Sequence, residues 1–402
     1  GSFVETVTEN DIEQVAAELA GARLPVLVGG AGIRNSAAAP LFREFAESLK
    51  CPVVFTHGGR GVLPDTHPQV LDYGLEPGLT VTRDADVVFV VGSSIGEKIG
   101  FGGNPYFHGQ EGFTNLFGER GRQRWIHLNQ DVSAIGRNRD VDVALVGDMR
   151  RVLPRLTAAL RRSPVNGTPQ LPAWQQQRRE RYRALFAEAP DMKPIHSGRM
   201  MVEIQKALPD DVVIINGGGA VNLWTQYYQC HNIAGQLKSS KLGNLGTGVP
   251  YAMGAALALR EAGNRVCVLG GDGGFGFYPM ELETAVRYQL PIVVIVGYDA
   301  GWSLEVPYYT YLTGMTFEVD HNFMRLDELA RTMGAHGEFC ETTDQIAPAV
   351  RRAFASGKPA LVQVVIDRAT NAYKIPNLDQ VSRFHADKQV YVNRADTQAK
   401  ED

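Results

Sequence analysis

The feature that most constrains the fold is the alternation of short apolar runs with longer segments of helical periodicity. In the first part of the chain we predict buried strands at LPVLVGG, CPVVFT, DVVFVVG, RWIHLN and VDVALVGD. Amphipathic segments such as AAAPLFREFAESL separate several of them. Strands that are apolar throughout and joined by helices are typical of parallel sheets covered on both faces. The sequence therefore predicts an α/β fold built from doubly wound parallel sheets.

A break in this alternation divides the chain into two predicted domains. Turn-rich SPVNGTPQLP and the charged segment WQQQRRERYRALF interrupt the pattern, and strands at DVVIING, RVCVLGG, PIVVIVGY and ALVQVVID then alternate with further helices. We predict a central Rossmann-like domain over residues 1–162, a linker and packing helix over 163–195, a second domain that binds diphosphate and Mg²⁺ over 196–370, and a polar tail over 371–402.

Composition excludes several classes of function. The 402 residues carry a net charge of −4 and no large basic block, which argues against nucleic acid as the main partner. No apolar run is long enough to cross a membrane, so we expect no membrane partner. The four cysteines are scattered without metal-ligand spacing, and we expect a reduced, cytoplasmic protein.

The stretch GDGGFG, from Gly271 to Gly276, lies between a predicted strand and a predicted helix, as the glycine loop of a dinucleotide site does. Asp299 follows Gly276 by 23 residues, so the spacing alone leaves NAD binding open. Asp272 argues against it, because two like charges about 4 Å apart repel by roughly 4 kcal/mol at an effective dielectric constant of about 20. A divalent cation between carboxylate and diphosphate reverses the sign of this interaction. Asp272 therefore predicts a metal–diphosphate site.

The next predicted strand supplies the other metal ligands. Mg²⁺ prefers about six oxygen ligands, of which a diphosphate and a water molecule provide about three. Asp299 and the Gly301 carbonyl follow the strand PIVVIVGY, and the carboxyl ends of neighbouring parallel strands meet at one crevice. We therefore predict Asp272, Asp299 and Gly301 as the protein ligands of Mg²⁺.

Several segments resemble, in order, the thiamin-diphosphate (ThDP) enzymes, and most closely the group of acetolactate synthase, benzaldehyde lyase and acyl-CoA lyases. Gly271–Trp302 is similar to the metal-binding motif of the family, with 25 residues between Gly273 and Asp299. GNLGTGVPYAMGAALA resembles the pyrimidine-binding loop and VVIINGGGAVNLW a diphosphate-contacting loop. The second metal position is usually Asn in the family, and we expect the extra charge of Asp299 to tighten metal binding and to repel the diphosphate somewhat.

The resemblance implies ThDP and Mg²⁺ as cofactors and assigns roles to single residues. The Gly243 carbonyl would accept a hydrogen bond from the 4′-amino group of ThDP. Leu245 would be the apolar wedge that holds the cofactor in a V shape, with a plain core leucine as the alternative. Gly219 and Ala220 would lie against the diphosphate, with an ordinary strand-to-helix turn as the alternative.

Further residues follow from the same resemblance. Gly273 and Gly274 would contact the diphosphate beside Asp272, and Trp302 would line the substrate pocket, with core packing as its alternative. The implied reaction makes or breaks a C–C bond next to a carbonyl, with a 2-keto acid or an aldehyde as substrate. The turn GGAGIRNS in the first domain holds FAD or a nucleotide in some relatives, and we expect it to be empty here.

The family also implies a partner. Its first domain, the pyrimidine-binding domain, carries a glutamate that activates the cofactor, and no segment of this sequence resembles that domain. We expect a separate subunit to supply it, in a hetero-oligomer with two copies of each chain. The alternatives are a truncated longer chain, a non-catalytic ThDP-binding or regulatory subunit, and an NAD-dependent oxidoreductase.

Overall fold

A computed structural model describes most of the chain. The described residues are 6–73, 75–96, 99, 102–103, 116–118, 121–162, 165–187, 189–227, 235–238, 243–306, 309 and 314–371. They belong to two compact units, Gly1–Arg181 and Tyr182–Asp402. The division falls inside helix α6 (Leu171–Ala187), within the segment predicted as linker and packing helix. The predicted domain boundaries stay predictions, and the tail beyond residue 371 lies outside the described residues.

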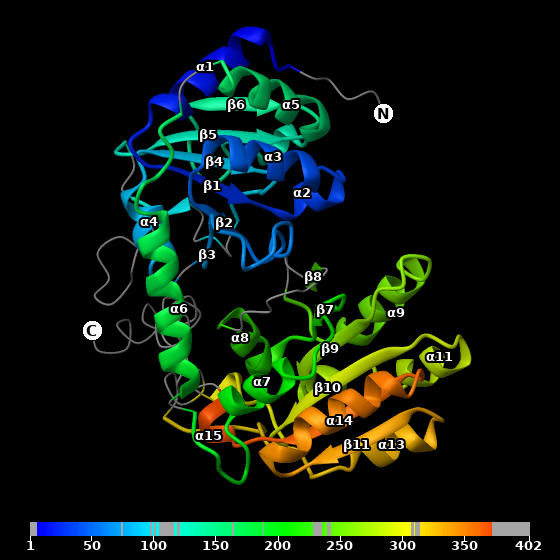
Figure 1. Cartoon of the computed structure of the whole chain (residues 1–402). Helices are drawn as coiled ribbons and strands as arrows, with labels where there is room; N and C mark the ends of the chain where they lie inside the picture. The colour runs from blue at the N-terminus through cyan, green and yellow to red at the C-terminus, as the bar shows by residue number, and fades with distance from the viewer. Residues whose placement is uncertain are drawn as a thin grey trace, which may run out of the picture. The chain divides into compact units, whose positions relative to one another are not determined.

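The first unit contains a six-stranded, fully parallel sheet in the order β3-β2-β1-β4-β5-β6 (Figure 1). Its strands are β1 Pro25–Gly29, β2 Val53–Phe55, β3 Val70–Leu71, β4 Val87–Val91, β5 Arg124–Asn129 and β6 Val143–Val146. Five of them confirm the predicted strands. The sixth, β3, has only two residues, too few to show a pattern in the sequence.

Helices cover both faces of this first sheet. They are α1 Glu9–Gly21, α2 Ala31–Asn35, α3 Ala39–Leu49, α4 Gly78–Asp84 and α5 Met149–Leu160. On one face, α1, α3 and α5 pack on side chains such as Leu27 and Phe89. On the other face, Val26 and Val28 pack with Val81 of α4. Because strand β1 is buried on both faces, its sequence is apolar throughout rather than alternating.

Helix α6 is joined to the edge strand β3 by buried polar contacts. Gln175 donates to the Val70 carbonyl (2.7 Å), and the fully buried Arg178 donates to the Asp65 carbonyl (2.6 Å) and pairs with Asp72 (2.8 Å). Burial alone would raise the pKa of Asp72, but the neighbouring guanidinium groups lower it to about 2. These contacts cover backbone groups that an edge strand otherwise leaves exposed.

The second unit contains another six-stranded parallel sheet, in the order β11-β12-β10-β9-β7-β8 (Figure 1). Its strands are β7 Val213–Asn216, β8 Gly235–Lys238, β9 Val266–Gly271, β10 Ile292–Tyr298, β11 His336–Cys340 and β12 Ala360–Val365. The four inner strands confirm the predicted ones. The edge strands β8 and β11, with sequences GQLK and HGEFC, were not predicted because they are largely polar.

Helices flank this sheet and leave the carboxyl ends of the inner strands to loops. The helices are α7 Ser197–Gln205, α8 Gly219–Tyr227, α9 Gly248–Ala258, α10 Asp272–Phe275, α11 Glu281–Arg287, α13 Leu326–Thr332, α14 Thr343–Ala355 and α15 Arg368–Asn371. Helices α9, α11 and α13 share one core with the sheet, while α7 contacts α8 and α14. The predicted α/β class is thus confirmed in both units. Among the described residues, no helix is long and apolar enough to span a membrane.

Candidate functional site

Four segments meet at the carboxyl edge of the second sheet. Residues 217–220 follow β7, α10 follows β9 and residues 299–302 follow β10. The fourth segment, 243–246, joins them through Leu245: a Cβ added at Gly218 would lie 2.6 Å from the Leu245 side chain. The structure therefore brings the segments predicted from the sequence together.

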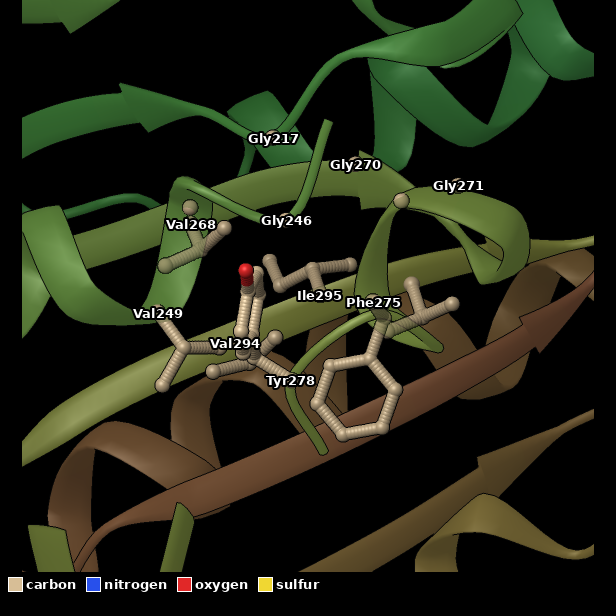
Figure 2. Close-up of a pocket in the computed structure, with 13 residues that line it drawn as sticks. Gly217, Gly246, Val249, Val268, Gly270, Gly271, Phe275, Tyr278, Val294 and Ile295 are labelled. Atoms are coloured by element: carbon tan, nitrogen blue, oxygen red, sulfur yellow. The ribbon is translucent and has the colours of Figure 1, made fainter. Parts of the chain in front are cut away.

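Glycine allows the backbones of these segments to approach closely. A Cβ added at Gly270 would lie 3.1 Å from the Gly217 Cα, and one added at Gly274 would lie 2.7 Å from the Gly217 carbonyl oxygen. Beneath the glycines is a small apolar pocket, around which Figure 2 shows side chains that include Val249, Val268 and Val294. The pocket lies under the predicted diphosphate site and offers no charged side chain of its own.

Asp272 is the most buried acid of this cluster, with 8% of its surface exposed. The sequence suggested a glycine loop here, with the next helix beginning near residue 278. Instead the chain enters the short helix α10 at Asp272 itself. The Gly301 N–H donates to the Asp272 carboxylate (3.0 Å), and His321 Nδ1 lies 3.6 Å from the same oxygen. The carboxylate is therefore fixed on one side by the loop that carries Asp299.

The electrostatics of the two acids favour a cation. Burial, and after it the negative charge of Asp299, raise the pKa of Asp272, and hydrogen bonds from backbone N–H groups oppose both effects. The net result is a pKa of about 7. A divalent cation bound between these carboxylates would lower their pKa values and favour their charged forms. Carboxylate and carbonyl oxygens are also the ligands that Mg²⁺ prefers, so the donor set fits this ion.

Two carboxylates do not complete such a site. Among the described residues, no three His, Cys, Asp or Glu side chains are grouped as metal ligands. The remaining ligands must come from backbone oxygens, water and a bound anion, as the sequence predicted. The structure shows the N–H of Gly301 at Asp272, whereas its carbonyl as a metal ligand stays a prediction.

The loop after β10 is held in a defined conformation. Asp299 accepts a hydrogen bond from the Ser303 hydroxyl. Ala300 has a φ of 57°, in the left-handed region that non-glycine residues seldom adopt. Gly301 forms an antiparallel bridge with Asp320, and the Trp302 N–H donates to the Val319 carbonyl (2.8 Å). A loop tied down in this way presents Asp299 from a fixed position.

Trp302 packs across α10. A Cβ added at Gly273 would lie 2.7 Å from the indole ring, which also meets the rings of Phe277 (5.9 Å) and His321 (5.0 Å) edge-on. The indole is only half-buried. Packing is therefore part of its role, and its contact with substrate stays a prediction.

The loops predicted to hold the cofactor differ in exposure. Gly243 is exposed with a φ of 66°, and Leu245 is half-buried. Gly219 has a φ of 74° and open space where a Cβ would be, while Ala220 is buried at the start of α8. Their places agree with the predicted roles, which stay predictions.

Sequence reasoning missed two residues of this cluster. His321 lies 22 residues beyond Asp299 and reaches Asp272 only because of the bridge at Gly301. Arg368 follows the distant strand β12 and donates to the Asp299 carbonyl (2.8 Å). No local motif marks either residue: the bridge between Gly301 and Asp320 places His321 here, and the pairing of β12 with β10 places Arg368.

The glycine turn of the first unit is hydrogen-bonded to the end of strand β4. The Gly30 N–H donates to the Val91 carbonyl (2.8 Å) and the Gly32 N–H to the Gly92 carbonyl (2.9 Å). Those donors therefore already have partners. The expectation that this turn holds neither FAD nor a nucleotide stays a prediction.

Comparison with known families agrees with the geometry. Residues 12–156 match the family described as "Thiamine pyrophosphate enzyme, central domain". Residues 217–364 match "Thiamine pyrophosphate enzyme, C-terminal TPP binding domain", where thiamine pyrophosphate (TPP) is another name for ThDP. The second match includes both predicted metal carboxylates and all the other predicted site residues.

Individual relatives are similar over most of this chain. A probable acetolactate synthase of Mycobacterium bovis is 28% identical over 358 residues, which are 89% of this chain and 62% of the relative. The 2-hydroxyacyl-CoA lyase 1 of Mus musculus is 26% identical, over 88% of this chain and 61% of the relative. The acetolactate synthase isozyme 2 large subunit of Escherichia coli is 26% identical, over 92% and 65%. The chain thus spans less than two thirds of the length of these curated relatives.

Proposed function

Because the chain belongs to the thiamine pyrophosphate enzymes and contains their central and C-terminal domains, we propose that it is part of a ThDP-dependent enzyme that makes or breaks a C–C bond next to a carbonyl. Its homology to acetolactate synthases and 2-hydroxyacyl-CoA lyases supports this reaction class. We propose a 2-keto acid or an aldehyde as the substrate and the cytoplasm as the location.

The observation that carries the proposal is the pair of neighbouring acids at the edge of the second sheet, the buried Asp272 and the half-buried Asp299. Asp272 and Asp299 lie close enough for the negative charge of Asp299 to raise the pKa of Asp272. Such a pair is costly to ionise unless a cation binds. We propose that Mg²⁺ binds there, with the Gly301 carbonyl as a third protein ligand, and holds the diphosphate of ThDP.

When bound, ThDP supplies the nucleophilic carbon and the electron sink that C–C chemistry next to a carbonyl requires. The chain's own residues bind and orient. Asp272 and Asp299 hold the metal, and the small residues Gly219 and Gly274 let the backbone approach an anion. Leu245 provides an apolar contact beside them, against Gly218. Trp302 packs on Gly273 of α10, next to Asp272.

A second polypeptide that carries the pyrimidine-binding domain and its activating glutamate completes the proposed enzyme, with two copies of each chain. Helix α9 supports a partner, because its sequence GVPYAMGAALA is apolar on all sides while Tyr251 and Leu257 are 43% and 54% exposed. Helices of this kind are normally buried. Phe277 and Tyr278 extend the exposed apolar surface and pack on Gly246, beside the predicted wedge.

Activity of the tagged chain purified from its native host tests this function. The assay supplies ThDP, Mg²⁺ and either pyruvate or a 2-hydroxyacyl-CoA, and measures CO₂ or aldehyde release. We expect turnover by the co-purified complex, loss of turnover after the partner is stripped, and recovery on recombination. Robust turnover by the chain alone would refute the need for a partner, while a complex that binds ThDP without turnover would support a non-catalytic subunit.

A further inference from the structure

Arg368 lies where the last strand of the second sheet meets the loop that carries Asp299. Strand β12 pairs with β10 up to Tyr298 and Val365, and the Ile366 N–H donates to the Tyr298 carbonyl (3.0 Å). Two residues later, Arg368 begins α15. The sheet register itself therefore brings this side chain to the predicted metal loop.

The Arg368 guanidinium contacts two backbone carbonyls and one carboxylate. Its Nη2 donates to the Asp299 carbonyl (2.8 Å) and to the Ala300 carbonyl, and its Nη1 pairs with Asp320. A Cβ added at Gly301 would overlap the same Nη2 atom. The guanidinium thus fills the space beneath the loop and leaves the carboxylate of Asp299 to other partners.

The segment that Arg368 ties to the loop is the one that carries His321. The Trp302 N–H donates to the Val319 carbonyl, and the His321 N–H donates to the Ala300 carbonyl (both 2.8 Å). Arg368 adds a link of a different kind, because it bonds the loop through carbonyls and the opposite segment through the Asp320 carboxylate. A planar guanidinium can make these bonds together, whereas a single ammonium group cannot reproduce its fork.

We propose that Arg368 is a positioning residue that fixes the 299–301 loop in the conformation that binds Mg²⁺. This inference rests on the proposed function, because it takes Asp299 and Gly301 as metal ligands. Without Arg368, the Asp299 carbonyl loses this donor, the Ala300 carbonyl keeps only the His321 N–H, and Ala300 loses a support for its left-handed conformation. The loop then samples other conformations, and metal binding must first order it again.

The test compares Arg368→Gln and Arg368→Lys with the matched control Arg331→Gln in the full chain. Arg331 lies in the same unit, also donates to a backbone carbonyl (Gly337, 2.9 Å) and also pairs with an aspartate (Asp327, 2.8 Å). Two readouts are used: hydrogen–deuterium exchange of the free chain, and calorimetric titration of Mg²⁺ in the presence of ThDP.

We expect Arg368→Gln to accelerate exchange of the Gly301, Trp302 and His321 amides and to weaken Mg²⁺ binding about tenfold, with Arg368→Lys in between and Arg331→Gln like the wild type. Unchanged exchange at these amides, or acceleration spread evenly over the second unit, would overturn the positioning role. If the wild-type chain binds neither Mg²⁺ nor ThDP, the proposed function fails, and the exchange pattern alone still decides whether Arg368 fixes the loop.

Discussion

At the scale of the residue, Asp272 has to satisfy opposing requirements. Its burial suits a metal ligand shielded from water, but the same burial and the charge of Asp299 make ionisation unfavourable and raise its pKa to about 7. A carboxyl whose pKa is higher in the folded than in the unfolded state destabilises the fold as the pH rises from about 4 to about 7. In the metal-free protein, the Asp272 carboxylate at the proposed metal site therefore lowers the free energy of unfolding near pH 7 and above.

Asp272→Asn should separate these two effects. Asn can accept the Gly301 hydrogen bond without carrying a charge. Without metal, we therefore expect the free energy of unfolding of the variant to exceed that of the wild type by roughly 2 kcal/mol at pH 8 and to be nearly the same at pH 4. The same variant should lose measurable Mg²⁺-dependent ThDP binding. Denaturant unfolding at both pH values, together with calorimetry, checks the prediction. A variant that is destabilised at pH 8 and still binds Mg²⁺ would show that Asp272 has another role.

Proton competition gives a related pH dependence in the wild type. Because Mg²⁺ needs the charged carboxylate and Asp272 holds its proton up to a pH of about 7, the apparent Mg²⁺ affinity should fall about tenfold per pH unit below that value. Titrations of Mg²⁺ between pH 5.5 and 8.5 measure this slope. A flat profile would argue against Asp272 as a ligand.

Asp299→Asn tests the position where this sequence departs from the family. Asn is the usual residue there, and the change removes the negative charge that, together with burial, raises the pKa of Asp272. We expect weaker Mg²⁺ binding, less repulsion of the diphosphate and metal binding that persists to lower pH. Calorimetric affinities for Mg²⁺ and ThDP provide the measurement. If neither affinity changes, Asp299 is not a metal ligand.

At the scale of the element, the site depends on glycines where strands end and loops cross. Gly273→Ala should push the Trp302 ring away from α10, since the new Cβ would lie 2.7 Å from it. We expect a loss of stability of about 1–3 kcal/mol and weaker Mg²⁺ binding, because the displaced indole belongs to the metal loop. Thermal unfolding and calorimetry report the two effects.

The matched control for that variant is Gly254→Ala. Gly254 lies inside helix α9 and has no atom within 4 Å of an added Cβ, so the change should stabilise the helix by about 0.5–1 kcal/mol. If both substitutions changed stability and Mg²⁺ binding equally, the overlap of the new Cβ with Trp302 would not explain the effect of Gly273→Ala.

The elements show why part of this arrangement was predictable. Strands β9 and β10 are apolar throughout and the motif residues follow them directly, so Asp272 and Asp299 could be placed at one sheet edge from sequence alone. Strands β8 and β11 lie at the edges of the sheet, where polar sequences are tolerated, and give no periodic signal. His321 and Arg368 reach the site through strand pairing across long separations, which local patterns do not encode.

At the scale of the whole molecule, the two units have different parts in the proposed enzyme. All the predicted site residues lie in the second unit, whereas the first has its own parallel sheet and a glycine turn whose N–H groups donate to the end of β4. Ligand binding should therefore stabilise the second unit selectively, by an amount that grows with the logarithm of ligand concentration above the dissociation constant.

We propose that Asp272 and Asp299 hold a metal–diphosphate cofactor. Calorimetric titration of the full chain measures whether this cofactor binds. Three titrations are compared: ThDP with Mg²⁺, ThDP with EDTA in place of Mg²⁺, and NAD⁺. We predict saturable binding of ThDP only when Mg²⁺ is present, and none of NAD⁺. Binding of NAD⁺, or ThDP binding that is equally tight in EDTA, would contradict the account.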